Sequence, residues 1–180
     1  MKVTKLEKIR ACRDAREWVA TQKNYTEAWQ NCERGDWMLW LAKRLKVDDR
    51  KLTLAKFKCA NQIRHLMKDQ RSLDVLDAAE RYGKGEISRE ELNVAADAAY
   101  AAAYAAYAAY AAYAADAADA AAYAAAYAAY AADAAYAAAY AAAYAADATA
   151  YIRNESLRKS ADFCREILTE EVLTAYEKIK

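Results

Sequence analysis

The chain has 180 residues, enough for one domain with a single buried core. Its 27 Lys and Arg nearly cancel its 26 Asp and Glu, and a net charge of +1 excludes a general attraction to duplex nucleic acid or anionic membrane. Proline is absent, glycine occurs three times and 57% of residues are hydrophobic, which excludes a sandwich, a barrel or a disordered chain. The composition predicts an all-α protein.

Residues 1–94 have mixed sequence, and their apolar spacing predicts a series of helices joined by short connections. One amphipathic helix is expected to carry Leu6, Ile9, Cys12, Ala15, Trp18 and Val19. Thr26 is expected to cap a short helix that Gly35 closes, and Asp36 to start the next one. Asp48 or Asp49 then opens a longer helix, and Ser72 begins another that ends before Gly83.

Ser88 marks the best-defined helix start of the chain. Ser88 and Glu91 have the spacing of a capping box, and Ile87 and Leu92 have the spacing of a hydrophobic staple. The helix that follows is expected to run directly into an Ala-rich repeat.

Residues 95–150 form a low-complexity tract of 39 Ala, 11 Tyr, 5 Asp and one Thr, which favours helix by propensity alone. The bulky or charged residues recur every three or four positions, but five steps of three from Tyr104 to Asp119 turn this stripe by about 300°. Either one helix spirals past several neighbours, over about 120 Å from Ser88 to Leu168, or it breaks near residues 114–119. We favour the break, so that long Ala/Tyr-rich helices fold back as a hairpin.

A second reversal is expected near residues 147–149, before the closing segment 151–180, in which Thr169 is expected to cap a short last helix. The predicted architecture is a single domain, residues 1–180, built as a multi-helix bundle or short helical solenoid. The tyrosine stripe is a candidate interface, through packing, base stacking or formation of a homodimer or higher homo-oligomer. It comprises Tyr100, Tyr104, Tyr107, Tyr110, Tyr113, Tyr123, Tyr127, Tyr130, Tyr136, Tyr140 and Tyr144.

Residues with catalytic or metal-binding chemistry are sparse. The four cysteines lack CxxC spacing and are expected to be buried thiols in a reducing compartment. His65 is the only histidine and is expected to be structural, and no nucleophile, phosphate-loop or zinc-hydrolase motif occurs. We therefore expect no catalytic residue, metal or cofactor. The charged first ten residues and the Asp-flanked Ala/Tyr window predict a cytoplasmic protein without a membrane segment.

All four tryptophans fall within 23 residues, beside several arginines. Packing of the first helices explains this cluster, but Trp with Arg is also the composition of a binding hot spot.

Several segments carry a resemblance to a known family. They are residues 11–18 (ACRDAREW), 32–41 (CERGDWMLWL), 78–86 (AAERYGKGE), 88–92 (SREEL), the Ala-rich tract and 165–168 (REIL). In this order they resemble the Imm-five-like family of immunity proteins of bacteria and phages. The resemblance implies no catalytic residues. The candidate binding residues within these segments are Arg13, Arg16, Trp18, Arg34, Asp36, Trp37 and Trp40.

The resemblance implies a non-enzymatic immunity-like or anti-defence protein that neutralises a protein toxin or a host defence protein by stoichiometric binding. A sponge for a nucleotide immune signal, with Tyr or Trp stacking the base and Arg holding phosphate, is the alternative. A structural helical spacer is the third possibility, favoured if residues 88–168 form one rod.

Overall fold

A computed structural model describes residues 2–67, 70–108 and 150–179 of the chain. Every regular element among them is helical, as the composition predicts. In chain order these are α1 (Lys2–Lys8), α2 (Arg13–Ala20), α3 (Tyr25–Asn31), α4 (Gly35–Arg44), α5 (Asp49–Asn61), the 3-10 helix η1 (Arg64–Leu66), α6 (Gln70–Gly83), α7 (Arg89–Ala108) and α10 (Ala150–Glu177).

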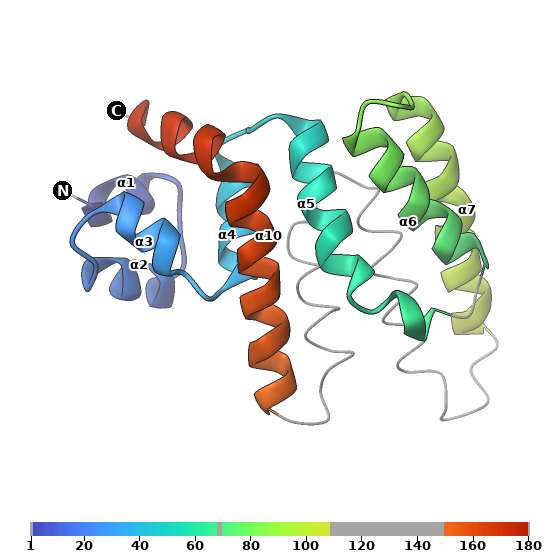
Figure 1. Ribbon diagram of the computed structural model, residues 1–180, viewed down its shortest axis with the longest axis horizontal. Helices are drawn as coiled ribbons and strands as arrows, with labels where there is room; N and C mark the ends of the chain where they lie inside the picture. The colour runs from blue at the N-terminus through green and yellow to red at the C-terminus, as the bar shows by residue number, and fades with distance from the viewer. Residues whose placement is uncertain (1, 68–69, 109–149, 180) are drawn as a thin grey trace.

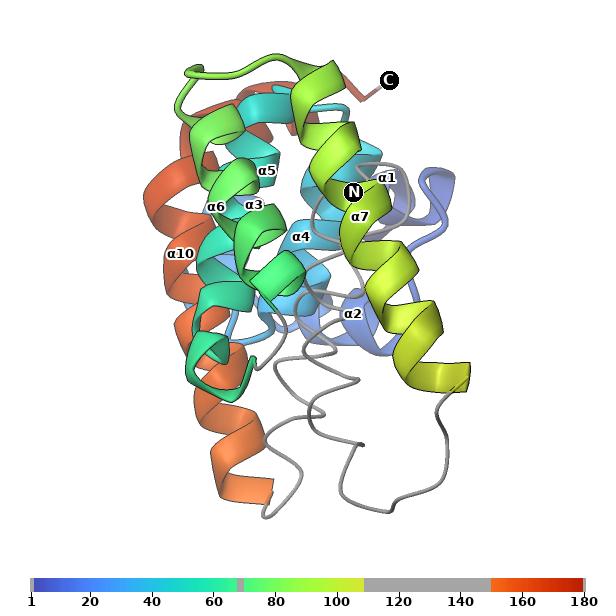
Figure 2. The same ribbon diagram turned by 90° about the vertical axis from the view of Figure 1, so that its right-hand side faces the viewer.

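Four helices pack side by side in the order α10, α5, α6 and α7, and α4 packs against both α10 and α5 (Figures 1 and 2). The short helices α1–α3 gather beside α4 and the C-terminal part of α10, at the end of the molecule where both termini lie (Figure 1). The described residues therefore form a multi-helix bundle.

Helix α5 separates two hydrophobic cores because it buries residues on opposite sides. Leu52, Ala55 and Cys59 belong to the first core, which α1–α4 and α10 complete. Phe57 and Ala60 belong to the second core, which lies between α5, α6 and α7.

The prediction of one amphipathic helix over Leu6–Val19 is wrong. The chain leaves α1 at Arg10, whose φ of 61° lies in the left-handed region. The Ala11 N–H donates to the Leu6 carbonyl at 2.9 Å, and the Arg10 N–H donates to the Glu7 carbonyl at 2.9 Å. This pair of bonds is a Schellman motif, which ends a helix and redirects the chain. The apolar periodicity continues across the turn and conceals it.

Two predicted helix starts are confirmed. The Asp48 carboxylate accepts a hydrogen bond from the Lys51 N–H at 3.0 Å. The Ser88 hydroxyl accepts from the Glu91 N–H at 3.2 Å, while the Glu91 carboxylate accepts from the Ser88 N–H at 2.8 Å. In both cases the donor and acceptor lie three residues apart, so the signal is local.

Four other predicted helix boundaries are wrong. Asn24, not Thr26, caps α3, because its side chain accepts from the Glu27 N–H at 2.7 Å. Ser72 is buried inside α6. Helix α10 continues through Thr169, whose hydroxyl donates back to the Arg165 carbonyl at 2.6 Å.

The fourth is Gly35, which begins α4 instead of closing α3. It does so where α4 crosses α10 too closely for a side chain: a Cβ built on Gly35 would lie 2.4 Å from the Ser160 Cβ.

Helices α7 and α10 belong to the same packed body, linked through α6 and α5. α7 and α10 therefore do not lie along a single straight rod of about 120 Å, the arrangement that would favour a structural spacer. The predicted break near residues 114–119 and the predicted reversal at 147–149 lie outside the described residues.

Candidate functional site

The aromatic residues of the first four helices enclose a cleft of about 420 Å³. All four tryptophans line it, together with Tyr25 from α3. We call this feature the tryptophan cleft. Every residue that lines it lies between Leu6 and Leu41, so the N-terminal helices form its whole surface. Its volume lies within the range of small-molecule and anchor-residue sites.

The cleft has a buried floor and a half-buried rim. Trp29, Met38 and Cys32 are almost fully buried and form part of the floor. Trp18 and Trp37 are partly exposed at the rim, with their ring centroids 6.2 Å apart in a T-shaped arrangement. This edge-to-face geometry is one of the two arrangements that aromatic pairs prefer.

Helix α10 holds the floor in place from behind. The Trp29 indole N–H donates to the Thr169 hydroxyl at 2.9 Å, so a buried polar group is satisfied across the helix–helix contact. The ring of Tyr25 stacks on Tyr176 with centroids 3.3 Å apart. The Arg165 guanidinium donates to the Cys32 carbonyl at 2.7 Å, beyond the last turn of α3. The position of α3 therefore depends on α10.

Arg34 and Asp36 form a fixed pair at the rim. The guanidinium donates two hydrogen bonds to the carboxylate, at 2.8 and 2.5 Å, and lies 4.4 Å from the centroid of the Trp37 ring. The hydrogen bond to Asp36 raises the pKa of Arg34. Because two of the guanidinium N–H groups bind Asp36, the pair presents a neutralised, rigid edge instead of a free cation.

Tyr25 and two cysteines supply further polar groups at the cleft. The Tyr25 hydroxyl is buried and has no hydrogen-bond partner in the part of the chain that the structure describes. Burial raises the pKa of Tyr25 well above its usual value and raises the pKa of Cys32 to about 11. Cys12 is exposed, which corrects the expectation that all four thiols are buried, because it precedes α2 instead of lying within a helix.

Five of the seven predicted binding residues line the cleft: Trp18, Arg34, Asp36, Trp37 and Trp40. Arg13 and Arg16 do not. Arg13 lies on the outer side of α2 with 78% of its side chain exposed, beside Glu17. Arg16 donates to Glu7 at 3.1 Å and so joins α2 to α1. These two arginines are not brought together with the other predicted site residues.

The prediction missed Tyr25 and Asp14 as lining residues, and it included Trp29 only as a member of the tryptophan cluster. A spacing of four and three residues separates Tyr25, Trp29 and Cys32, which places them on one helical face. This spacing could have indicated from the sequence that the three residues line one site. Thr169 and Arg165 had no such signal, because their role depends on a contact across more than 130 residues.

The structure describes the backbone of only part of the predicted tyrosine stripe. Tyr100, Tyr104 and Tyr107 fall within α7, but their side chains are outside what the structure describes. The other eight tyrosines of the stripe lie outside the described residues. The stripe remains a prediction.

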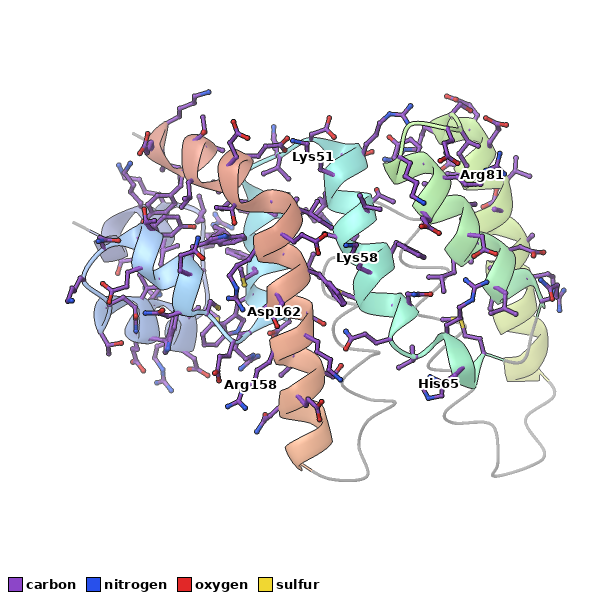
Figure 3. All side chains as sticks on the ribbon, in the orientation of Figure 1. Lys51, Lys58, His65, Arg81, Arg158 and Asp162 are labelled. Carbon is purple, nitrogen blue, oxygen red and sulfur yellow. The ribbon has the colours of Figure 1, made fainter. Side chains whose placement is uncertain are left out.

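Charged side chains form ion pairs between α5 and α10. Figure 3 shows Lys51 and Lys58 on α5, and their ammonium groups lie 2.7 Å from Glu171 and Glu166 of α10. His65 is exposed in η1 (Figure 3), so burial gives no support to the expectation that it is structural. In the described ranges no group of three His, Cys, Asp or Glu is placed to hold a metal ion. No helix within those ranges is long and apolar enough to cross a membrane.

Comparisons with protein-family models, curated proteins and solved structures found no match for the chain. The resemblance to the Imm-five-like family therefore stays a prediction.

Proposed function

We propose that the protein is an immunity-like or anti-defence protein that neutralises a protein toxin or defence protein by stoichiometric binding, with the tryptophan cleft as its docking site. The observation that supports this proposal is the convergence of four tryptophans, a tyrosine and an arginine–aspartate pair on one cleft. Trp, Tyr and Arg are the residues that dominate binding energy at protein interfaces. A rim fixed by Arg34 and a floor fixed by α10 give a preorganised site, which lowers the entropy lost on binding.

The charges of the cleft favour a protein partner over the alternative, a nucleotide signal. Asp14 and Asp36 line it, and so do Arg10 and Arg34, so its two carboxylates are matched by two guanidinium groups. Arg34 is already committed to Asp36, and Arg13 and Arg16 lie outside the lining. Aromatic rings suited to stacking a base are present, but among the described residues Arg10 is the one lining cation outside the Arg34–Asp36 pair, whereas strong phosphate sites combine several cationic donors.

Co-expression tests this function directly. The chain is expressed with a panel of bacterial toxins, scored by growth, and with a panel of phage-defence systems, scored by phage plating. We expect the wild type to relieve one member and Trp37→Ala to lose that effect. Arg81→Ala, on α6 far from the cleft (Figure 3), is the matched control and should retain it.

Stoichiometry separates binding from catalysis. The relieved partner is purified with the chain and the complex is measured by light scattering, where a fixed molar ratio is expected. Protection by far less than one chain per partner would contradict stoichiometric binding. Equal protection by the wild type and Trp37→Ala, with both folded by circular dichroism, would contradict the role of the cleft.

A further inference from the structure

Arg10 and Lys46 end two helices at positions where glycine is the usual residue. The Lys46 and Val47 N–H groups donate to carbonyls of α4 at 3.0 and 3.2 Å, the same Schellman pattern that ends α1 at Arg10. Helix α6 ends in this pattern too, with Gly85 at the left-handed position. Arg10 and Lys46 adopt the left-handed conformation with a side chain, which strains the backbone. Such departures from a local rule concentrate at functional sites.

Arg44 joins the two strained helix ends. Its Nε donates to the Ile9 carbonyl at 3.1 Å, directly before Arg10, and Lys46 follows Arg44 by two residues. The three cationic side chains are exposed, and none of them forms an ion pair within the part of the chain that the structure describes. We call Arg10, Arg44 and Lys46 the basic cluster. Because Arg10 also lines the tryptophan cleft, the basic cluster adjoins the cleft.

The carboxylates of the cleft and of the adjoining helices and turns have cationic partners of their own. Counted by carboxylate and cation, these pairs are Glu7 with Arg16 at 3.1 Å, Asp14 with Arg13 at 3.9 Å, Asp36 with Arg34 at 2.5 Å and Glu171 with Lys51 at 2.7 Å. The Asp48 carboxylate accepts from the Lys51 N–H at the start of α5. The positive charge of the basic cluster is therefore not compensated by these groups.

The charge of the whole chain is divided in the same sense. Residues 1–48, which include every residue of the cleft, carry eleven Lys and Arg against seven Asp and Glu. Residues 49–180 carry sixteen Lys and Arg against nineteen Asp and Glu. A protein with this division of charge attracts an acidic partner and turns its positive end toward that partner.

The positions of the three cations favour a protein surface over a nucleotide. A phosphate group is held best where several donors converge on it. Arg10 lines the cleft but Arg44 and Lys46 do not, so a nucleotide stacked on the tryptophans meets one member of the basic cluster. Carboxylates on an acidic protein surface are separate from one another and pair with cations that are spread over two helix ends.

We propose that the partner protein presents an acidic surface, whose carboxylates pair with Arg10, Arg44 and Lys46 while the adjacent part of that surface docks at the tryptophan cleft. This inference rests on the proposed function, because it names the charge by which the partner is recognised. It also gives a reason for the two strained helix ends, since glycine at these positions relieves the strain but removes two of the contacts.

Two capped peptides of equal length test the inference on the full-length chain: hexaglutamate and hexaglutamine, which differ in charge. Each is titrated by calorimetry at about 20 mM and about 150 mM salt. We expect hexaglutamate to bind the wild type at the lower salt concentration with a dissociation constant below about 1 mM, and to bind several-fold more weakly at the higher one. Hexaglutamine should not bind.

The double variant Arg10→Gly with Lys46→Gly removes two cations at positions that suit glycine. It should bind hexaglutamate about fivefold more weakly than the wild type and unfold at a higher urea concentration. The matched control is Arg81→Ala with Lys84→Ala, which removes the same charge from the far end of α6 (Figure 3). This control should bind hexaglutamate within about twofold of the wild type.

Equal weakening by the two double variants would overturn the proposal, because binding would then follow net charge and not the basic cluster. Absence of hexaglutamate binding at several millimolar would overturn it as well. Adenosine triphosphate is titrated in parallel, and tighter binding than hexaglutamate that Arg10→Gly with Lys46→Gly weakens would overturn it in favour of a phosphate ligand.

The co-expression assay separates this inference from the proposed function. Arg10→Gly with Lys46→Gly should reduce protection, as Trp37→Ala does. Full protection by the glycine variant together with its loss in Trp37→Ala would overturn the acidic surface and leave the cleft as the docking site. Full protection by both variants would contradict both proposals.

Discussion

Replacing Gly35 by alanine tests the closest helix crossing of the fold. A Cβ at this position would lie 2.4 Å from the Ser160 Cβ, 2.7 Å from the Ser160 carbonyl carbon and 2.8 Å from the Ala161 nitrogen. Two of these three atoms are backbone, so no side-chain rotation relieves the overlap. Helix α4 must move away from α10, and the buried contacts of Cys164 and Ser160 must loosen with it.

The size of the effect follows from two opposing terms. Overpacking a tight core costs about 3 kcal/mol when backbone has to move. Alanine has a better helix propensity than glycine by at most about 1 kcal/mol, and less at the first residue of a helix. We therefore expect Gly35→Ala to lower the free energy of unfolding by about 2 kcal/mol, which lowers the melting temperature by about 4–8 °C for a chain of this length.

Chemical unfolding followed by circular dichroism measures this change, and a double-mutant cycle with Ser160→Gly identifies its cause. Removing the Ser160 Cβ eliminates the shortest of the three overlaps, so Gly35→Ala should be less damaging in that background by at least about 0.5 kcal/mol. A Gly35→Ala variant as stable as the wild type, or strictly additive effects of the two changes, would refute the close crossing. Because Asp36 and Trp37 directly follow Gly35, the same variant should also reduce the protection measured in the co-expression assay.

Three further changes have effects of defined sign. Tyr25→Phe should raise the free energy of unfolding by about 1 kcal/mol in urea titrations, because it removes a buried hydroxyl without a hydrogen bond; a loss of stability would mean that the hydroxyl is paired. Lys46→Gly should stabilise by about 1 kcal/mol in the same assay, because Lys46 has a φ of 55° at the end of α4 and glycine adopts this conformation freely; an unchanged or lower stability would contradict the strain. Burial lowers the pKa of Lys56 to about 8 from 10.5, so the unfolded chain binds this proton more tightly than the folded chain does. Relative to Lys56→Met, the free energy of unfolding of the wild type should therefore rise by up to about 3 kcal/mol between pH 8 and pH 10.5. Parallel pH profiles of the two proteins would contradict the shift.

Helix starts that depend on neighbouring side chains could be predicted from the sequence, whereas the turns that depend on backbone geometry could not. Asp48 and the Ser88–Glu91 box carry their hydrogen-bond partners within three residues. Arg10 and Lys46 end their helices in left-handed conformations that glycine normally adopts, so their residue types gave no warning. Gly85, with a φ of 83°, makes the same turn with the residue that signals it.

Helical phase explains which predicted site residues converge. Trp18 faces the cleft, and at 100° per residue Arg13 and Arg16 lie about 140° and 160° away from it around α2. Asp14 and Ala15 lie within about 60° of Trp18, and both line the cleft. The aromatic members of the site were predictable from their clustering. The arginines of α2 were included because they lie in segments that resemble a family, and membership of a segment does not show which face of a helix a residue occupies.

The support behind the cleft comes from a part of the chain that contributes none of its lining. Arg165, Thr169 and Tyr176 contact α3 or the residue that follows it, and their spacing of four and seven residues places them on one face of α10. Any group that occupies the cleft and binds the folded chain alone must therefore also stabilise the contact between α3 and α10, since binding and docking are linked. The C-terminal helix thus determines the shape of the cleft together with the tryptophans, although no residue type within it indicates this role.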